Sequence, residues 1–375
     1  MDFELNAEQR AVREAFRRLV DEQIVPQAQA IDAAAEFPRQ AFQAVGRLGF
    51  FGMRYPQEVG GSGHDVVSYC LAVQELARGS LSVAAACTMQ SLMGTYFLYR
   101  SGDPALHDEF LRPALAGERV GTICFTEPGA GSDLSAMTTR ARREGDGWVL
   151  HGQKTWITSA PVADFFTVFA KTSSREIAPF LVPRGTPGLK VGRNIPKLGV
   201  RASVTSEVAL EDCHLPARFL LAREGQGRIL LEEVLEKIRL MTAALALGAA
   251  QGALDVALTY AAARIQFGRP IKEFQAIKLR LAEMATELEA ARHLTLYGAW
   301  RDDRGLPSRK EAAMAKLFAS ETGLKVCDGA ARVLASYGYA EEYPVERHLR
   351  DVRFTLIGGG TSDILKLVIA KELYA

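Results

Sequence analysis

Thr126-Glu127-Pro128-Gly129-Ala130-Gly131-Ser132-Asp133, followed by Trp156-Ile157-Thr158, is the most informative part of this chain. The small residues let main-chain N–H groups approach a phosphate or an electron-rich ring edge, and the hydroxyls add adaptable hydrogen bonds. This pattern favours a flavin as ligand. Glycine-rich turns are also common in surface loops, and a tryptophan in a strand is usually part of a core, so the surrounding sequence must distinguish these interpretations.

Three further segments follow in a fixed order: residues 264–271 (RIQFGRPI), 343–351 (YPVERHLRD) and 359–364 (GGTSDI). Together with residues 56–63 (PQEVGGSG) and the glycine-rich stretch, they resemble the acyl-CoA dehydrogenase family. The likeness covers essentially the whole chain. It implies an N-terminal helical domain, a central β-domain and a C-terminal four-helix bundle, and a flavoprotein oxidoreductase that acts on a CH–CH bond.

The local patterns independently indicate helices, then strands, then helices. Asn6 and Gln9 have the spacing of a capping box at the start of the first helix. Further helical patterns occur at 41–48, 66–77 and 106–115, β-rich runs at 165–169, 179–182 and 208–210, and long helical segments at 229–265, 274–301, 310–337 and 361–373. We therefore predict an α+β protein, mainly α, with a helical domain at 1–120, a β-domain at 121–223 and a helical bundle at 224–375.

Composition limits the kind of protein that this chain can be. With 375 residues, 48% of them hydrophobic, and a net charge of +1, it can bury a large core and shows no bias toward nucleic acid. The most apolar run, residues 240–250, is too short to span a bilayer, and the first residues form no apolar signal segment, so we expect no membrane association. Five separated cysteines without a CxxC pair favour a reducing cytoplasm. No metal-binding histidine spacing and no GxSxG or GxxxxGK motif occurs, so we expect neither a metal nor hydrolase chemistry.

The resemblance implies that FAD is the cofactor. Thr126 and Ser132 would hydrogen-bond the flavin ring or its pyrophosphate, while Trp156 and Thr158 would close one face and one edge of the isoalloxazine. A second group would reach the adenosine diphosphate part of a neighbouring subunit's FAD, and it comprises Arg264, Gln266, Phe267 and Gln275. The resemblance therefore implies a homodimer or homotetramer.

One departure from the family pattern affects this second group. Where the family usually has a glutamine and then two glycines before Tyr-Gly-Tyr, this chain has Arg332 and then Ala335-Ser336. The added Cβ atoms narrow a place where backbone approaches the nucleotide, and Arg332 adds positive charge. FAD is therefore expected to bind weakly, or through a compensating contact between arginine and phosphate.

The catalytic base is missing from both positions at which the family places it. Dehydrogenation of an acyl thioester needs a carboxylate above the α-carbon, yet the commonest position is Gly359 here and the second, just before an arginine, is Ile238. Glu236 is the nearest acid and remains a candidate only if the helix bulges, because two residues along a regular helix rotate it by about 200°. The resemblance implies that Thr361 and Asp363 contact the cofactor instead. The sequence thus identifies no catalytic base.

Three functions remain open from the sequence. The first and leading one is FAD-dependent α,β-dehydrogenation of an acyl thioester of coenzyme A or an acyl carrier protein, with an electron-transfer flavoprotein or oxygen as electron acceptor. The second is a flavin-dependent oxygenase or oxidase on the same scaffold, which would need no base. The third is a catalytically silent subunit that pairs with an active homologue.

Overall fold

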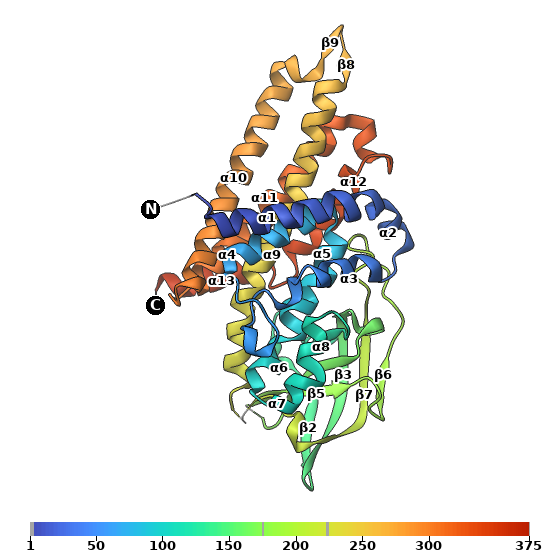
Figure 1. The fold of residues 1–375 in the computed structure, drawn as a ribbon, viewed down its shortest axis with the longest axis vertical. Coiled ribbons are helices and arrows are strands. Elements are labelled where there is room, and N and C mark those ends of the chain that lie inside the picture. The colour runs from blue at the N-terminus through green and yellow to red at the C-terminus, as the bar shows by residue number, and fades with distance from the viewer. Residues whose placement is uncertain (1–3, 175, 223–224, 375) are drawn as a thin grey trace.

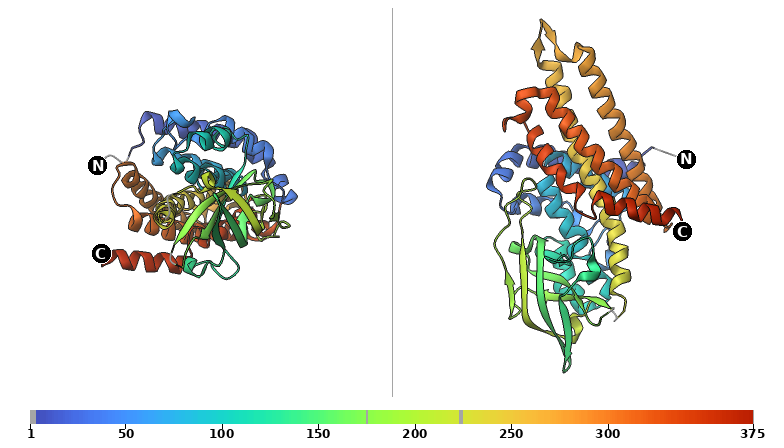
Figure 2. Two further views of the ribbon diagram at one scale, coloured as in Figure 1. Left: turned by 90° about the horizontal axis from the view of Figure 1, so that it is seen from below. Right: turned by 180° about the vertical axis from the view of Figure 1, so that it is seen from behind.

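The computed structural model describes residues 4–174, 176–222 and 225–374, and it confirms the predicted α+β, mainly helical, class. The β-domain forms one end of an elongated molecule, the first helices lie across its middle, and two long helices run to the opposite end (Figure 1). Figure 2 shows the long helix α9 (Gly227–Ala263) between the N-terminal helices and the last helix, α13 (Ser362–Leu373).

The N-terminal region begins with the capping box that the sequence predicts. The Asn6 side chain accepts a hydrogen bond from the Gln9 backbone at 2.8 Å, and the Gln9 side chain accepts one from the Asn6 backbone at 3.1 Å. Short 3-10 and π-helical segments connect the helices that follow. The helices are α1 Ala7–Leu19, α2 Ala28–Ala34, α3 Arg39–Arg47, α4 Val66–Gly79, α5 Leu81–Thr88, α6 Tyr96–Ser101, α7 Pro104–Leu106 and α8 Arg112–Leu115.

One mixed sheet forms the β-domain, in the order β1-β4-β2-β3-β7-β6 with β5 paired to β4. Its strands are β1 Gly121–Cys124, β2 Arg140–Glu144, β3 Gly147–Thr158, β4 Phe165–Lys171, β5 Ile177–Pro183, β6 Leu189–Val191 and β7 Thr205–Pro216. The antiparallel pairing of β3 with β7 is interrupted by a bulge between Lys154 and Ile157. This bulge overlaps the start of the Trp156-Ile157-Thr158 motif and changes the direction of the side chains there.

The C-terminal region is the predicted helical bundle. It consists of α9, α10 (Gln275–Asp303) and α11 (Arg309–Leu334), with the shorter α12 (Val345–Val352) and α13 packed against them. Two predicted helix ends were wrong. α9 ends at Ala263 because β8 (Ile265–Gln266) pairs with β9 (Arg269–Pro270) in a hairpin, and α11 ends at Leu334 because Ala335 has a φ of +53°.

Two helical stretches are long and apolar enough to cross a membrane by length and composition, Leu81–Ser101 and Gly227–Ala263. The apolar run at residues 240–250 lies within the second stretch, which is one helix of 37 residues. Within the fold, 94% and 83% of their apolar windows are buried. Packing in the core accounts for their apolar character.

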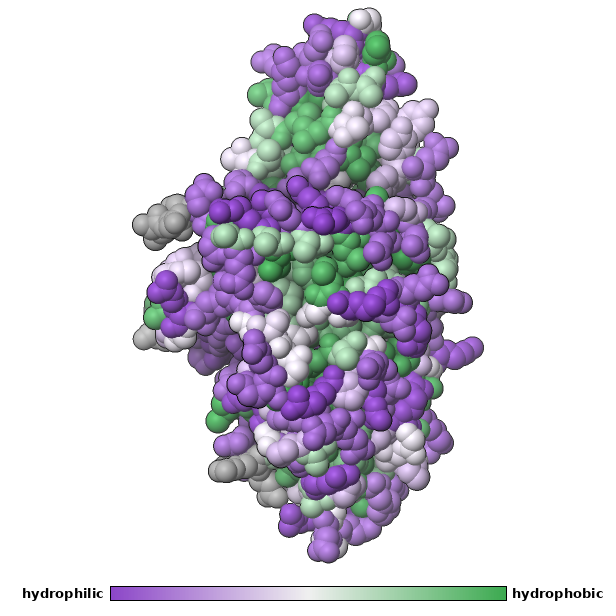
Figure 3. Space-filling model, in the orientation of Figure 1, coloured by the Kyte–Doolittle hydropathy of each residue, from purple (hydrophilic) through white to green (hydrophobic). Residues whose placement is uncertain are grey.

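The surface alternates between polar and apolar areas, and one apolar area lies on the arm formed by α9 and α10 (Figure 3).

Candidate active site

The glycine-rich turn lies directly against strand β3. The backbone N–H of Thr155 donates to the carbonyl of Thr126 at 3.0 Å, which joins the two motifs. A Cβ placed on Gly129 or Gly131 would meet nothing within 4 Å. The turn therefore presents its backbone to open space beside the strand, as a ligand-binding turn must.

A buried ion pair connects the turn to the same strand. Lys154 Nζ donates to Glu127 Oε1 at 2.7 Å, and their side chains are 0% and 2% exposed. The carboxylate also accepts from Thr138 N at 2.6 Å, Thr138 Oγ1 at 2.8 Å and Thr139 N at 3.0 Å. Burial alone would raise the pKa of Glu127, but these hydrogen bonds outweigh it and lower the pKa to about 2. Glu127 is therefore ionised at neutral pH.

Trp156 lies outside the protein core. Its side chain is 58% exposed, and its φ of +59° lies in the left-handed region that a bulky residue rarely adopts. The next residue, Ile157, is buried. The interpretation of Trp156 as an ordinary core residue is therefore wrong, because a strained backbone holds a large aromatic ring toward solvent.

The hydroxyl residues assigned to the flavin occupy the two motifs that the fold brings together. Thr126 is half-buried at the start of the turn, and Ser132 is exposed near its end. Thr158 is half-buried at the end of β3, and its carbonyl accepts from Thr122 Oγ1 at 2.6 Å. The turn and the strand that carries Trp156 thus both bear hydroxyl side chains that are at least partly accessible.

The residues assigned to a neighbouring subunit's cofactor lie at the far end of the molecule. The β8–β9 hairpin stands at the tip opposite the β-domain (Figure 1), and Phe267 at that tip is 93% exposed with a φ of +51°. Arg264 lies over the Tyr337 ring at 6.0 Å, and Gln266 Nε2 donates to its neighbouring carbonyl at 2.8 Å. Gln275 is the exposed first residue of α10. One chain therefore holds these two groups apart, at its β-domain and at the tip of its bundle.

The departures from the family pattern lie next to this hairpin. Ala335 adopts φ +53° and ψ −125°, a conformation that favours glycine, immediately after α11. Arg332 Nε donates to Asp328 at 2.6 Å, and both side chains are exposed. Ser336 is exposed in the short 3-10 helix that follows. The alanine therefore introduces backbone strain at this place.

The two positions at which the family places its base lie against each other. A Cβ on Gly359 would lie 3.2 Å from Ile238 Cγ2 and 3.2 Å from Thr242 Oγ1. Gly359 has a φ of +73°, and Ile238 is buried. The Thr242 hydroxyl donates to the Ile238 carbonyl at 2.8 Å, so it satisfies its own helix. Neither position supplies a carboxylate at this contact.

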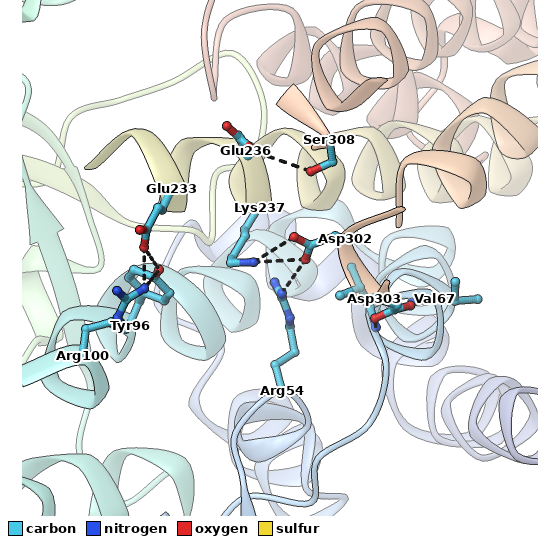
Figure 4. A network of polar contacts seen from close by, with 11 residues as sticks. Arg54, Val67, Tyr96, Arg100, Glu233, Glu236, Lys237, Asp302, Asp303 and Ser308 are labelled. Atoms are coloured by element: carbon cyan, nitrogen blue, oxygen red, sulfur yellow. Dashed lines mark hydrogen bonds and ion pairs between the residues drawn. The ribbon is translucent and has the colours of Figure 1, made fainter. Parts of the chain in front are cut away.

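Glu236 makes its hydrogen bond elsewhere. It accepts from Ser308 Oγ at 3.4 Å, just before α11, and Figure 4 shows it on the side of α9 opposite Glu233 and Lys237. Burial raises the pKa of Glu236, although Arg239 opposes the shift. The contact with Gly359 is made by other residues of α9.

A polar network on the opposite side of α9 joins it to the N-terminal helices (Figure 4). Lys237 Nζ and Arg54 Nη2 contact Asp302 at 3.0 and 3.2 Å. Asp303 accepts from the backbone N–H of Val66 at 2.6 Å, at the start of α4. Burial raises the pKa of Asp303 to about 6. This network holds the end of α10 against α9 on one side and against the N-terminal region on the other.

Two buried cations for which the sequence predicted no role lie near the glycine turn before α13. Lys316 is fully buried and donates to the Gly360 carbonyl at 2.6 Å, and burial lowers its pKa to about 8. Arg239 is 7% exposed, and its Nε has no hydrogen-bond partner in the described part of the chain. No local sequence pattern marks Lys316, whereas Arg239 is the arginine that follows the second family position for the base, Ile238.

Thr361 and Asp363 make local contacts at the start of α13. The Thr361 side chain caps the helix by accepting from Ile364 N at 3.3 Å. Asp363 is exposed and pairs with Lys366 at 3.0 Å. Among residues 4–174, 176–222 and 225–374, no group of three or more His, Cys, Asp and Glu side chains could hold a metal ion.

Comparison with known proteins adds independent findings. Models of the acyl-CoA dehydrogenase N-terminal, middle and C-terminal domains match residues 6–118, 122–213 and 225–374. The chain is 57% identical over 375 residues to benzylmalonyl-CoA dehydrogenase of Aromatoleum aromaticum, and the match covers 100% of both.

Two solved structures extend the likeness to three dimensions. Butyryl-CoA dehydrogenase of Megasphaera elsdenii has a TM-score of 0.97 and 34% identity, with 100% of each chain covered. A glutaryl-CoA dehydrogenase of Mycobacterium smegmatis in complex with FADH2 has a TM-score of 0.95 and 32% identity, covering 98% of this chain and 95% of that one.

Proposed function

Because this chain belongs to the acyl-CoA dehydrogenase family, we propose that it oxidises a coenzyme A thioester whose α-carbon carries a carboxylate, and that loss of CO2 replaces loss of an α-proton. The chain is an oxidoreductase of the acyl-CoA dehydrogenase type. The observation that carries the proposal is the contact between Gly359 and Ile238, where no carboxylate stands. The benzylmalonyl-CoA dehydrogenase supports the substrate class, because a malonyl thioester has its second carboxylate on the α-carbon.

The proposed reaction balances without a base. The bond between the α-carbon and the carboxylate breaks, its electron pair forms the Cα=Cβ double bond, and a hydride leaves Cβ. The products are CO2 and an α,β-unsaturated thioester. When bound, the flavin supplies the acceptor for that hydride.

The surface around Gly359 suits a departing carboxylate. A glutamate at this position would place a second negative charge against the substrate carboxylate and oppose its binding. The buried Ile238 side chain instead supplies an apolar wall. Loss of hydration beside such a wall costs a charged carboxylate much more free energy than it costs neutral CO2, so the wall favours the release of CO2.

The described residues fit FAD as the cofactor. The exposed, strained Trp156 offers a planar apolar surface, and the adjacent turn offers unobstructed backbone at Gly129 and Gly131. The FADH2 complex of the related glutaryl-CoA dehydrogenase supports this assignment. We assign the flavin to Thr126, Ser132, Trp156 and Thr158, with Thr361 and Asp363 on the side of the bundle.

The adenosine diphosphate part would be contacted by a second copy of the chain. The hairpin residues stand at the end of the molecule opposite the β-domain, and Phe267 is almost fully exposed there. We propose a homodimer or homotetramer in which Arg264, Gln266, Phe267 and Gln275 of one copy reach the FAD of another. Five buried, unpaired cysteines support a reducing cytoplasm as the place of action.

The test compares two thioesters that differ only in the α-carboxylate. The FAD-loaded protein is mixed anaerobically with benzylmalonyl-CoA or with 3-phenylpropionyl-CoA, and flavin absorbance and CO2 release are followed together. We expect flavin bleaching and one CO2 per flavin with the first thioester and neither with the second. Equal bleaching by 3-phenylpropionyl-CoA would contradict the proposal, and a flavin that stays oxidised with both would favour a silent subunit.

The electron acceptor is a separate question. An electron-transfer flavoprotein and oxygen are both compatible with the family, and turnover with each in air-free and air-saturated buffer distinguishes them. Hydrogen peroxide formed in proportion to CO2 would assign oxygen, while turnover only with the flavoprotein would assign the latter.

A further inference from the structure

We propose that the buried Glu127–Lys154 ion pair positions the two parts of the flavin site, the glycine-rich turn and strand β3, relative to each other. The proposal rests on FAD binding at this site. Both residues act through their neighbours, so they are positioning residues and take no part in the reaction.

The ion pair lies where the glycine-rich turn and strand β3 are hydrogen-bonded to each other. Glu127 follows Thr126 in the turn, and Lys154 precedes Trp156 by two residues on β3. The 2.7 Å bond between their charged groups lies beside the 3.0 Å backbone bond from Thr155 to Thr126. One side-chain bond and one backbone bond therefore hold the turn to the strand.

The bulge in β3 gives Lys154 and Trp156 opposite directions. On a regular strand, residues two apart share one face. Here Lys154 is fully buried while Trp156 is 58% exposed, because the register shifts between Lys154 and Ile157. Anchoring Lys154 inward therefore helps to hold the strained Trp156 ring outward, at a φ of +59°.

A third segment converges on the same carboxylate. Thr138 and Thr139 donate three hydrogen bonds to Glu127 just before β2 begins. With Lys154, the carboxylate has four donors, so its lone pairs are well satisfied. Directional bonds of this kind fix the orientation of a buried loop more tightly than apolar packing does.

The energetics make a positioning role testable. Removing one partner of a buried ion pair leaves an uncompensated charge and is strongly destabilising, whereas removing both charges is often neutral for stability. If the pair only stabilises the fold, the double variant should recover both its stability and its FAD affinity. If the pair positions the turn against the strand, the double variant should recover its stability but not its FAD affinity.

The experiment uses the FAD-loaded protein and the variants Lys154→Met and Glu127→Gln/Lys154→Met. Melting temperature, FAD retained after dialysis, the FAD dissociation constant and the visible circular dichroism of the bound flavin are measured for each. We expect Lys154→Met to lower the melting temperature and to weaken FAD binding by about tenfold or more, the scale of loss seen when a residue that orients a metal ligand is removed. The double variant is expected to recover the melting temperature but not the FAD affinity or the flavin dichroism.

A control variant separates this effect from the loss of any buried ion pair. Asp32 pairs with Arg350 at 2.7 Å in a partly buried contact between α2 and α12. Asp32→Asn is expected to lower the melting temperature without changing the dichroism of the bound flavin. Recovery of FAD affinity in the double variant, or unchanged affinity in Lys154→Met, would overturn the proposal. A wild-type protein that binds no FAD would instead overturn the proposed function.

Discussion

Gly359 and Ile238 meet at one point: a Cβ on the glycine would lie 3.2 Å from the Cγ2 atom of the isoleucine. The two family positions for a base, far apart in sequence, are therefore alternatives for one place in space. This chain fills that place with the Ile238 side chain and the Thr242 hydroxyl, and neither is a carboxylate. Outside the glycine's own segment, the atoms nearest to that Cβ all belong to Ile238 and Thr242, which favours a reaction that needs no carboxylate as proton acceptor.

Restoring the family's glutamate is expected to cost stability. Gly359→Glu would place a non-glycine residue at a φ of +73° and crowd Ile238, so we expect the free energy of unfolding to fall by about 1–2 kcal/mol. Urea unfolding measures this loss. The double variant Ile238→Ala/Gly359→Glu makes room for the new side chain.

This double variant also tests the charge argument. We expect it to oxidise a plain acyl-CoA and to lose activity toward the 2-carboxyacyl thioester, because the two carboxylates repel each other. Rates with both thioesters and one artificial electron acceptor make the comparison. A folded, FAD-loaded double variant with full activity toward the 2-carboxyacyl thioester would show that position 359 does not face the substrate carboxylate.

Glu236 is expected to be dispensable as a base. Its side chain binds Ser308, whereas Ile238 and Thr242 contact Gly359. Glu236→Gln should therefore keep kcat within about tenfold of wild type, since loss of a general base costs about 100- to 10,000-fold. Glu233→Gln on the opposite side of α9 is the matched control (Figure 4). A fall of kcat into the general-base range for Glu236→Gln alone would identify it as the missing base.

Trp156 should contribute to flavin binding but little to folding. Because its ring is mostly exposed, Trp156→Ala should change the free energy of unfolding of the FAD-free protein by less than about 0.5 kcal/mol. It should weaken FAD binding strongly. Trp148→Ala, at a buried tryptophan on the same strand, should instead cost about 3–5 kcal/mol. Equal FAD affinity in wild type and Trp156→Ala would remove the tryptophan from the cofactor site.

Sequence patterns predicted the order of helices, strands and helices because capping, apolar periodicity and turn residues act locally. The capping box at Asn6 and Gln9 is an example. They missed the β8–β9 hairpin, since its strands have two residues each, too short for any periodic pattern. They also extended α11 too far, because an alanine gives no local sign that it will adopt the φ of +53° seen at Ala335.

The site was predictable in its motifs but not in its connections. Thr126 and Trp156 were both assigned from sequence, yet nothing local shows that a buried Lys154 links their segments. Likewise, Gly359 and Ile238 were separate alternatives until the fold placed them in contact. Both relationships join residues far apart in the chain, and only tertiary packing determines them.

Ala335→Gly should stabilise the protein. Glycine adopts φ +53° and ψ −125° without a Cβ clash, so relief of strain of about 1–3 kcal/mol outweighs the larger chain entropy of glycine, about 0.5–1 kcal/mol. Thermal unfolding of the FAD-free protein measures the gain. Ser336→Gly, where the backbone needs no glycine, should destabilise slightly. If Ala335→Gly behaves like Ser336→Gly, the alanine is not strained in solution.

The pH dependence of stability should contain a contribution from Asp303. Burial raises the pKa of this carboxyl from 3.8 to about 6, so the folded protein binds its proton more tightly than the unfolded chain does. The stability from this group is fully present below pH 3.8 and is lost as pH rises through 6. Asp303→Asn cannot titrate, so the difference in free energy of unfolding between it and wild type should change across this window and stay constant above it. Urea unfolding at a series of pH values measures the difference.

Asp302→Asn is the control for this pH dependence. It removes the partner of Lys237 and Arg54, so it should lower the free energy of unfolding without removing the change between pH 3.8 and about 6. A difference between wild type and Asp303→Asn that is the same at every pH would show that Asp303 titrates alike in the folded and unfolded chains.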